Sequence, residues 1–171
     1  MILDKLTSIS TFILDVDGVL TDGSILATEE AEQNRTFNIK DGFAIHHAIN
    51  SGYDLIVISG GRSESVVKRL DFLGLQHIYI GVKDKREFLN NLKAELHLNL
   101  NECLYMGDDL IDLSVMQMCG VKVCPNDAVW AVQEVADIVT KSNGGEGAVR
   151  EILEKVLIMQ DKWVSTEHTV L

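Results

Sequence analysis

The sequence has little of what marks a disordered, secreted or membrane-bound chain. It contains one proline against 13 glycines, which argues against a disordered or low-complexity chain. Residues 1–10 lack a basic stretch followed by a long apolar run, and no other run is long enough to cross a bilayer. We therefore expect a soluble protein located in the cytoplasm.

Cysteine is also scarce. The three copies, Cys103, Cys119 and Cys124, are odd in number and form no CxxC motif. Cys103 and Cys124 lie in apolar runs typical of strands. We therefore interpret the cysteines as buried, reduced thiols and not as metal ligands.

Positive charge is limited as well. The sequence has 15 Lys and Arg residues against 26 Asp and Glu residues, a formal net charge of −11. This balance disfavours nucleic acids and anionic membranes as partners, because both attract basic surfaces. It does not exclude a small anionic substrate, since a few local basic side chains can outweigh the overall charge. Hydrophobic residues make up 46% of the 171 residues, enough for the core of one domain.

Short apolar runs alternate with amphipathic stretches along the chain. This alternation predicts an α/β fold: a single Rossmann-like parallel sheet with right-handed crossovers and helices on both faces. Ligands of such sheets bind beyond the carboxyl ends of the strands. The predicted strands are residues 11–14, 54–58, 77–80, 103–106, 121–123 and 137–139. The predicted helices are residues 42–50, 63–73, 85–97, 111–118, 128–135 and 148–160.

One segment interrupts the alternation. Residues 24–26 and 35–39 have the character of two short strands joined by an acidic stretch over 28–32. They predict a β-hairpin insert over about residues 24–39, which projects from the sheet after the first strand. We expect a single domain over residues 1–160 and a C-terminal tail over 161–171.

Two polar motifs follow the first two predicted strands. Asp15 and Asp17 leave the first strand on the same side, because they are two residues apart. One could attack or bind a metal while the other transfers a proton, although a turn capped by Asp explains the pair equally well. Ser59 and Gly60 follow the second strand and precede a helix, which suits an anion cradle or an ordinary capped turn.

Two further motifs carry charge at the start of a helix. Lys85 opposes the helix dipole there, which a bound phosphate would explain and a solvated lysine would explain too. Asp108, Asp109 and Asp112 follow the fourth predicted strand. Helix capping accounts for one or two of these acids, and a hard cation such as Mg²⁺ accounts for the cluster better.

The four motifs form one ordered pattern. They follow one another as DxDG, Ser, Lys and GDDxxD, and each stands at a strand end. With this pattern the sequence resembles the haloacid dehalogenase-like superfamily from residue 11 to about residue 156. The resemblance implies a phosphatase in which Asp15 attacks phosphorus and becomes an aspartyl phosphate. Asp17 would protonate the leaving alcohol and then deprotonate the attacking water.

The same resemblance implies how the site binds its ligands. Mg²⁺ would be held by Asp15, Asp108 and the backbone carbonyl of Asp17, with Asp109 and Asp112 orienting that shell. The positive charges of Mg²⁺ and a lysine would offset the repulsion between the attacking carboxylate and the phosphate. The residues implied to hold the phosphoryl oxygens are Ser59, Gly60 and Lys85.

The spacing of the motifs leaves no room for a cap domain. Asp17 and Ser59 are 42 residues apart (59 − 17), and Ser59 and Lys85 are 26 apart (85 − 59). Segments 21–23, 37–42 and 144–151 resemble the capless, tetrameric subgroup of the superfamily. This subgroup includes phosphatases of 3-deoxy-D-manno-octulosonate (KDO) 8-phosphate and of nine-carbon sugar acids (KDN or sialic acid 9-phosphate). Membership would imply lipopolysaccharide precursor synthesis and a homotetramer in which a neighbour completes each active site.

Arg62 bears on which sugar acid is bound. KDO 8-phosphate phosphatases tend to have Arg after the Ser/Thr-Gly step, and an Arg there could bind a carboxylate through two hydrogen bonds. This chain departs from the pattern by an extra glycine before Arg62. We also predict substrate contacts for Thr21, Asp41 and Arg69, with a helix N-cap as an equal explanation of Asp41.

Two other classes of function fit part of this pattern. A phospho-receiver domain also combines acids, Ser or Thr and Lys on a parallel sheet, but its phosphorylated Asp lies on a later strand than its acid pair. A non-catalytic scaffold is the other alternative, and it is disfavoured because each chemical position of the motifs is filled. The sequence therefore favours a phosphatase, and KDO 8-phosphate as its substrate.

Overall fold

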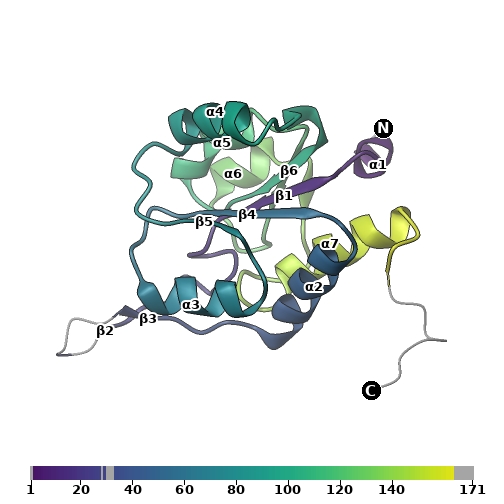
Figure 1. Ribbon diagram of the computed structural model, residues 1–171. Helices are drawn as coiled ribbons and strands as arrows, with labels where there is room; N and C mark the ends of the chain where they lie inside the picture. Colours follow the sequence, from purple (N-terminus) through teal and green to yellow (C-terminus); the bar gives the residue numbers. More distant parts are fainter. Residues whose placement is uncertain (1, 28, 30–32, 164–171) are drawn as a thin grey trace, which may run out of the picture.

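The computed structural model describes residues 2–27, 29 and 33–163. Its centre is a six-stranded sheet in the order β5-β4-β1-β6-β7-β8, with each neighbouring pair parallel (Figure 1). Each predicted strand is present, and its ends differ from the prediction by at most one residue. The strands are β1 (Thr11–Leu14), β4 (Asp54–Ile58), β5 (His77–Tyr79), β6 (Cys103–Met106), β7 (Val121–Cys124) and β8 (Ile138–Val139).

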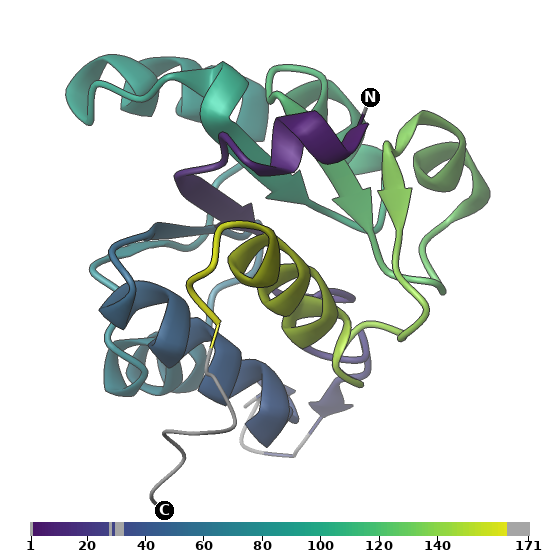
Figure 2. The same cartoon turned by 90° about the vertical axis from the view of Figure 1, so that its right-hand side faces the viewer.

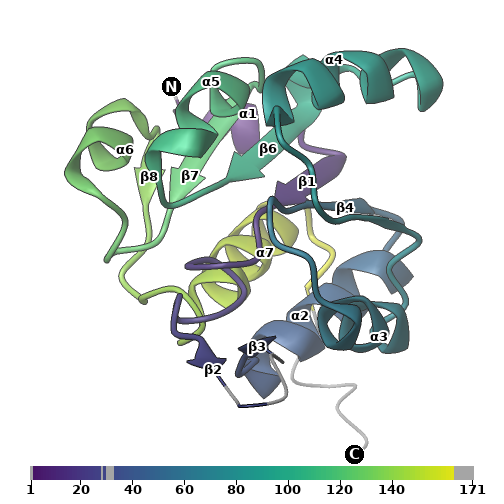
Figure 3. The same cartoon turned by 90° about the vertical axis from the view of Figure 1, so that its left-hand side faces the viewer.

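Helices cover both faces of the sheet, as predicted (Figures 1 and 3). One face carries α2 (Ile39–Asn50), α3 (Glu64–Phe72) and α7 (Ala148–Met159). The other face carries α4 (Lys85–Glu95), α5 (Leu113–Met116) and α6 (Trp130–Val135). Short 3-10 helices form over Leu100–Glu102 and Leu110–Asp112, and a helix that was not predicted, α1 (Ile2–Leu6), precedes β1.

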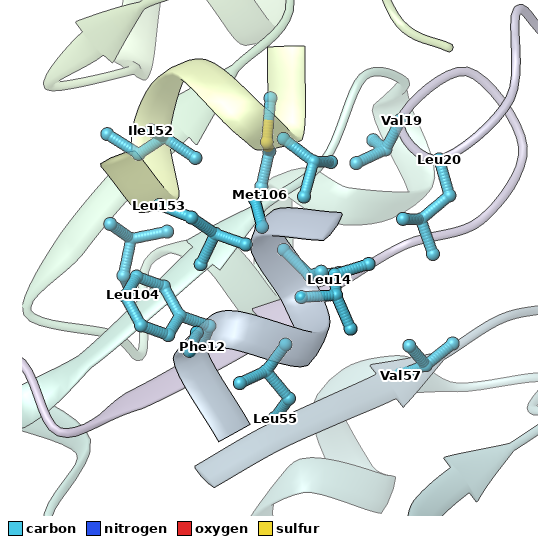
Figure 4. Packing of buried hydrophobic residues seen from close by; sticks show 14 of the residues in the cluster. Phe12, Leu14, Val19, Leu20, Leu55, Val57, Leu104, Met106, Ile152 and Leu153 are labelled. Atoms are coloured by element: carbon cyan, nitrogen blue, oxygen red, sulfur yellow. The ribbon is translucent and has the colours of Figure 1, made fainter. Parts of the chain in front are cut away.

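The two faces of the sheet bury separate hydrophobic clusters. Phe12 and Leu14 of β1 belong to the cluster under α2, α3 and α7, whereas Ile13 belongs to the cluster under α4, α5 and α6. This follows from the alternation of side chains along a strand. Figure 4 shows Phe12 and Leu14 packed with Leu104 and Met106 of β6. Full burial of such a side chain stabilises the fold by about 1.5–3 kcal/mol, so the central strands are firmly held.

The hairpin is present, but its second strand was predicted in the wrong place. The strands are β2 (Leu26–Ala27) and β3 (Gln33–Asn34), which pair antiparallel and lie apart from the main sheet (Figure 1). Residues 35–39 are not a strand, because the Asn38 side chain accepts a hydrogen bond from Lys40 N and caps α2. Most of the predicted acidic connection, residues 28 and 30–32, lies outside the described residues.

The cysteines and the helices bear on two expectations, that the thiols are free and that no segment crosses a membrane. The three cysteines are buried and form no disulfide, as predicted. Burial raises the pKa of the Cys103 thiol to about 11, which keeps it protonated and unreactive at neutral pH. Within the described ranges, no helix combines the length and the apolar character needed to cross a membrane.

Helices α2 and α7 lie side by side (Figure 2), and Trp163 packs on them. Trp163 meets the ring of His47 edge-on, with ring centroids 5.0 Å apart, and the Arg150 guanidinium lies 4.5 Å from the Trp163 ring centroid. The first residues of the predicted tail are therefore part of the packed structure. Residues 164–171 of that tail lie outside the described residues.

Candidate active site

The sheet brings three of the predicted motifs together at one edge. Asp15 follows β1, the central strand, while the loops after the adjacent strands β4 and β6 carry Ser59 and Asp108. The strand order turns to opposite sides of β1, which is where an open parallel sheet forms a crevice. A pocket of about 300 Å³ lies there, and its lining includes Asp15, Asp17, Ser59, Gly60, Asp108 and Asp109.

Lys85 joins Asp15 to Asp112 beneath this pocket. Its ammonium lies 2.7 Å from Asp15 Oδ2 and 2.8 Å from Asp112 Oδ1. All three residues are buried, with 4% of Lys85, 4% of Asp15 and 0% of Asp112 exposed. Charges this deeply buried require partners. An ammonium has three donors, so one remains for a phosphoryl oxygen.

Asp112 holds the acidic loop in place and accepts from several donors. Oδ1 also accepts from the Tyr105 hydroxyl at 2.8 Å. Oδ2 accepts from the amides of Asp108 at 3.1 Å and Asp109 at 3.4 Å. The Asp112 side chain is therefore engaged on both oxygens, an arrangement that suits the predicted orienting role better than direct binding of a metal.

Tyr105 was not predicted to belong to the site. It lies in the apolar run that forms β6 and is fully buried. The sequence gives one indication of a buried hydrogen bond, which is a hydroxyl in an otherwise apolar strand. A buried Tyr usually needs a hydrogen-bond partner. The sequence alone does not identify that partner as Asp112.

The acids at the pocket hold their protons unusually tightly. Burial, then the nearby Asp112 charge, raises the pKa of Asp15 to about 6, although Lys85 opposes the shift. Burial, then the charges of Asp15 and Asp112, raises the pKa of Asp108 to about 7. Burial alone would lower the pKa of Lys85, but the two carboxylates raise it above its usual value. The ionised cluster of three acids and one lysine carries two uncompensated negative charges.

This donor set fits a divalent cation. Carboxylate oxygens of Asp15, Asp108 and Asp112 lie within 4.8 Å of one another. No hydrogen-bond donor of the described residues contacts the Asp108 carboxylate, which lines the pocket. A Cβ at Gly18 would lie 2.0 Å from Asp108 Oδ2, so only glycine leaves room for this carboxylate. Oxygen ligands and excess negative charge suit Mg²⁺.

The Ser59 loop presents a group that could donate to an anion. Ser59 is 3% exposed, and its hydroxyl oxygen accepts from the Gly61 amide at 3.1 Å. The hydroxyl hydrogen remains available to donate to an anion. Helix α3 begins shortly after, at Glu64, and its first residues line the neighbouring hollow of about 590 Å³.

Arg35 is a second contact that the sequence did not indicate. Its Nε lies 2.5 Å from Asp17 Oδ1 and its Nη2 3.2 Å from Asp17 Oδ2. Arg35 stands just after β3, in a segment with no motif. No local pattern links it to a residue 18 positions earlier.

The two predicted substrate arginines lie outside the Asp15 pocket. Arg62 is exposed and packs over Gly81, where an added Cβ would lie 2.7 Å from its Nε. It lines a separate hollow of about 590 Å³ beside the hairpin. Arg69 is half-buried and extends toward α2, where a Cβ at Gly42 would lie 2.8 Å from its Nη2.

Thr21 and Asp41 are both buried. The Thr21 hydroxyl donates to the Val16 carbonyl at 3.3 Å, which closes the loop after Asp15. Asp41 Oδ1 accepts from the Arg150 amide at 2.6 Å and so caps α7, while the N-cap of its own helix is Asn38. These contacts account for Thr21 and for Oδ1 of Asp41 without a substrate, whereas Oδ2 of Asp41 is buried with no hydrogen-bond partner among the described residues. Contacts of Thr21 and Asp41 with a substrate stay predictions.

Comparison of the sequence with known proteins finds similar hydrolases. The profile of the haloacid dehalogenase-like hydrolases matches residues 77–153. The 3-deoxy-D-manno-octulosonate 8-phosphate phosphatase KdsC of Yersinia pestis is 37% identical over 161 residues, which cover 94% of this chain and 86% of the relative. KdsC of Escherichia coli K12 is also 37% identical, with the same coverage.

Solved structures give the same result for the fold. The crystal structure of the Yersinia pestis phosphatase aligns with a TM-score of 0.91 at 38% identity, covering 94% of this chain and 86% of that one. The Moraxella catarrhalis phosphatase, solved with a magnesium ion, a phosphate ion and KDO, aligns with a TM-score of 0.90 at 36% identity. That alignment covers 94% of this chain and 92% of the relative.

Proposed function

The chain belongs to the haloacid dehalogenase-like hydrolases, and from this membership we propose that it is a magnesium-dependent phosphatase of KDO 8-phosphate. The observation that carries the proposal is the position of Asp15. It follows the central strand, lines the pocket and bonds to a buried lysine. The KdsC relatives match nearly the whole chain and have this activity by name, which favours KDO 8-phosphate over nine-carbon sugar acid phosphates.

The chemistry runs in two halves on the residues of this chain. In the first, an Asp15 oxygen forms a bond to phosphorus while the bond between phosphorus and the sugar oxygen breaks. Asp17 donates a proton to that departing oxygen. In the second, Asp17 takes a proton from water, the water oxygen bonds to phosphorus, and the bond between phosphorus and Asp15 breaks. Asp15 is thereby restored, and KDO and inorganic phosphate leave.

The remaining site residues neutralise charge and orient the phosphate. Lys85 and the Ser59 hydroxyl are placed to donate to phosphoryl oxygens, together with the backbone at Gly60. Asp15 and Asp108 would hold Mg²⁺, with the Asp17 carbonyl as a further ligand and with Asp109 and Asp112 orienting the loop. When bound, Mg²⁺ supplies positive charge that lets an anionic carboxylate approach an anionic phosphate.

Four residues are proposed to select the sugar acid: Arg62, Arg69, Asp41 and Thr21. The two arginines could recognise its carboxylate only if the substrate extends beyond the 300 Å³ pocket. The hollow lined by Arg62 and Lys68 supports such an extended binding region.

We also propose that the protein is a cytoplasmic homotetramer in which a neighbour completes each site, acting in lipopolysaccharide precursor synthesis. Two features support an assembly. The described part of the chain contains no cap domain, and apolar side chains are exposed near the pocket and on the hairpin. Ile111, which lines the pocket, is 61% exposed, and Leu26 of β2 is 67% exposed. Light scattering should give about four times the 19.0 kDa chain mass.

A panel of phosphate esters tests the function directly. Phosphate release is measured with Mg²⁺ and with EDTA on KDO 8-phosphate, a nine-carbon sugar acid 9-phosphate and simple hexose phosphates. We expect Mg²⁺-dependent hydrolysis with the highest kcat/KM on KDO 8-phosphate. Equal kcat/KM values on KDO 8-phosphate and hexose phosphates would remove the substrate assignment, and no hydrolysis with Mg²⁺ would remove the phosphatase assignment.

A further inference from the structure

Arg35, a buried cation of the hairpin insert, contacts Asp17, the proposed acid/base. Arg35 directs Nε and Nη2 to the two oxygens of Asp17, and its Nη1 donates to the Gln33 carbonyl at 2.9 Å. Three nitrogens of one guanidinium are thus engaged. Paired bonds of this kind fix the plane of a carboxyl group as well as its position.

The two partners differ in their access to solvent. The Arg35 side chain is 3% exposed, whereas the Asp17 side chain is 36% exposed and lines the 300 Å³ pocket. Arg35 therefore approaches Asp17 from the protein side. Each carboxyl oxygen has two lone pairs, so each keeps one besides the bond from Arg35. The lone pair that faces the pocket is where Asp17 can carry the proton for the leaving oxygen.

Gly61 provides the space for this contact. An added Cβ there would lie 3.1 Å from Asp17 Oδ2 and 3.3 Å from Arg35 Nη2, closer than ordinary van der Waals contact. The Gly61 backbone does not have a positive φ, so conformational freedom does not explain the glycine. A methyl group at the extra glycine would therefore require the Arg35–Asp17 pair to shift by a few tenths of an ångström away from the Ser59 loop.

We infer that Arg35 is a positioning residue that aims the Asp17 carboxyl at the leaving oxygen of the substrate. The inference rests on the proposed function, because it gives Asp17 a proton to transfer. A general acid must lie within hydrogen-bond distance of the atom it protonates, and a side chain free to rotate spends less time there. Arg35, Asp17 and Gly61 are called the hairpin clamp below.

The leaving group provides the test. A sugar alkoxide needs a proton as its bond to phosphorus breaks, whereas 4-nitrophenolate is stable enough to leave without one. Steady-state kcat/KM, which reports the steps through phosphoryl transfer to Asp15, is measured for KDO 8-phosphate and for 4-nitrophenyl phosphate. For Arg35→Gln we expect a fall of about 30-fold or more on KDO 8-phosphate and of less than about 3-fold on the aryl ester, within the usual range for general acid catalysis.

Three further variants sharpen the test. Arg35→Lys should stay at least about tenfold below wild type on KDO 8-phosphate, because an ammonium cannot form two parallel bonds. Gly61→Ala, which shifts the pair without removing it, should cause a smaller loss that is still selective for KDO 8-phosphate. Adding it to Arg35→Gln should cause little further loss, since both act on one contact. Arg86→Gln, a change at an exposed arginine, is the matched control and should leave both substrates within about twofold of wild type.

The outcomes separate this inference from the proposed function. Equal losses on both substrates, or a wild-type rate for Arg35→Lys, would overturn the positioning role. If wild-type protein hydrolyses neither substrate with Mg²⁺, the proposed function fails and the inference falls with it. If Arg35→Gln does not fold, as judged by circular dichroism, Gly61→Ala gives the decision, and a loss that is not selective for KDO 8-phosphate overturns the inference.

Discussion

Two groups of side chains meet at the DxDG loop, and they are built differently. The sheet network is defined as Asp15, Lys85, Tyr105 and Asp112. It joins the residue after β1, one residue each of β6 and α4, and the end of the 3-10 helix before α5, and each side chain is at most 4% exposed. The hairpin clamp joins an insert to the same loop, and its acid, Asp17, is 36% exposed. The proposed nucleophile is thus held by the core of the fold, and the proposed acid/base is held by the hairpin insert. Substitutions in the two groups should therefore have different kinds of effect.

The largest effect is expected at Asp15, the proposed nucleophile. Asp15→Asn should lower kcat by about 10⁴-fold or more on every substrate, because an amide cannot form the covalent intermediate. The loss should not depend on the leaving group, unlike the loss expected for the hairpin clamp. Phosphate release by purified, folded variant measures it. Residual activity above about 1% of wild type would reassign the nucleophile.

Lys85 should show that the sheet network combines stability with activity. Lys85→Met leaves Asp15 and Asp112 buried without their cation, and breaking a buried ion pair typically costs about 3–5 kcal/mol. We expect a loss of this size in the free energy of unfolding, measured by urea denaturation, and a fall in kcat of about 10²-fold or more. Lys83→Met, at an exposed lysine two residues earlier, is the matched control. A wild-type unfolding curve for Lys85→Met would contradict the network.

Tyr105 should have a smaller effect on the same network. Tyr105→Phe removes one donor from Asp112 Oδ1 and keeps Lys85 there, so the expected loss is about 1.5–3 kcal/mol of unfolding free energy, typical of a hydrogen bond to a charged group. The fall in kcat should be less than about tenfold, because Lys85 still contacts Asp15. Tyr79→Phe, on an outer strand, is the control and should change neither quantity appreciably. If Tyr105→Phe has no effect on stability, Tyr105 is not part of the network.

The contrast between the two groups also explains what the sequence could predict. The residues of the sheet network, apart from Tyr105, stand in local motifs at strand ends, and parallel strands bring their carboxyl ends together by geometry alone. The strand boundaries were predictable for a related reason, because strands buried on both faces are continuous apolar runs. These signals are contained in a few consecutive residues.

The hairpin clamp gives no such signal. Arg35 lies in a short segment whose path depends on where α2 begins. The Asn38 cap sets this point, whereas the sequence pattern predicts a later start at residue 42. Its contact with Asp17 depends on the packing of the whole insert and on the missing side chain of Gly61. Asp41 is similar: its position suggested a helix cap, but the helix that it caps is α7, more than 100 residues away.

The smallest effect is expected at Asp41, which couples α2 to the start of α7 behind both groups. Burial raises the pKa of Asp41 above its usual value, against the opposing hydrogen bond from the Arg150 amide. The folded state therefore binds this proton more tightly than the unfolded state does. Wild-type protein should therefore lose stability relative to Asp41→Asn as the pH rises from the pKa of Asp41 in the unfolded state to its higher pKa in the folded state. Above that range, the difference in unfolding free energy between the two proteins should be constant.

Urea denaturation of wild type and Asp41→Asn between pH 4 and 8 measures that difference. Asp137→Asn is the control, because the pKa of Asp137 is lowered and its titration lies at or below the lower end of this range, so its difference from wild type should stay nearly constant. A difference between wild type and Asp41→Asn that does not vary with pH would mean that the Asp41 carboxyl titrates alike in both states. A difference in KM decides between the two explanations of Asp41, a helix cap and a substrate contact.

An unchanged KM of Asp41→Asn for KDO 8-phosphate fits a helix cap alone, whereas a KM raised severalfold with little change in stability would assign Asp41 to the substrate. The cap explanation is favoured by the burial of the carboxyl, since a side chain that is 2% exposed offers a sugar hydroxyl almost no surface.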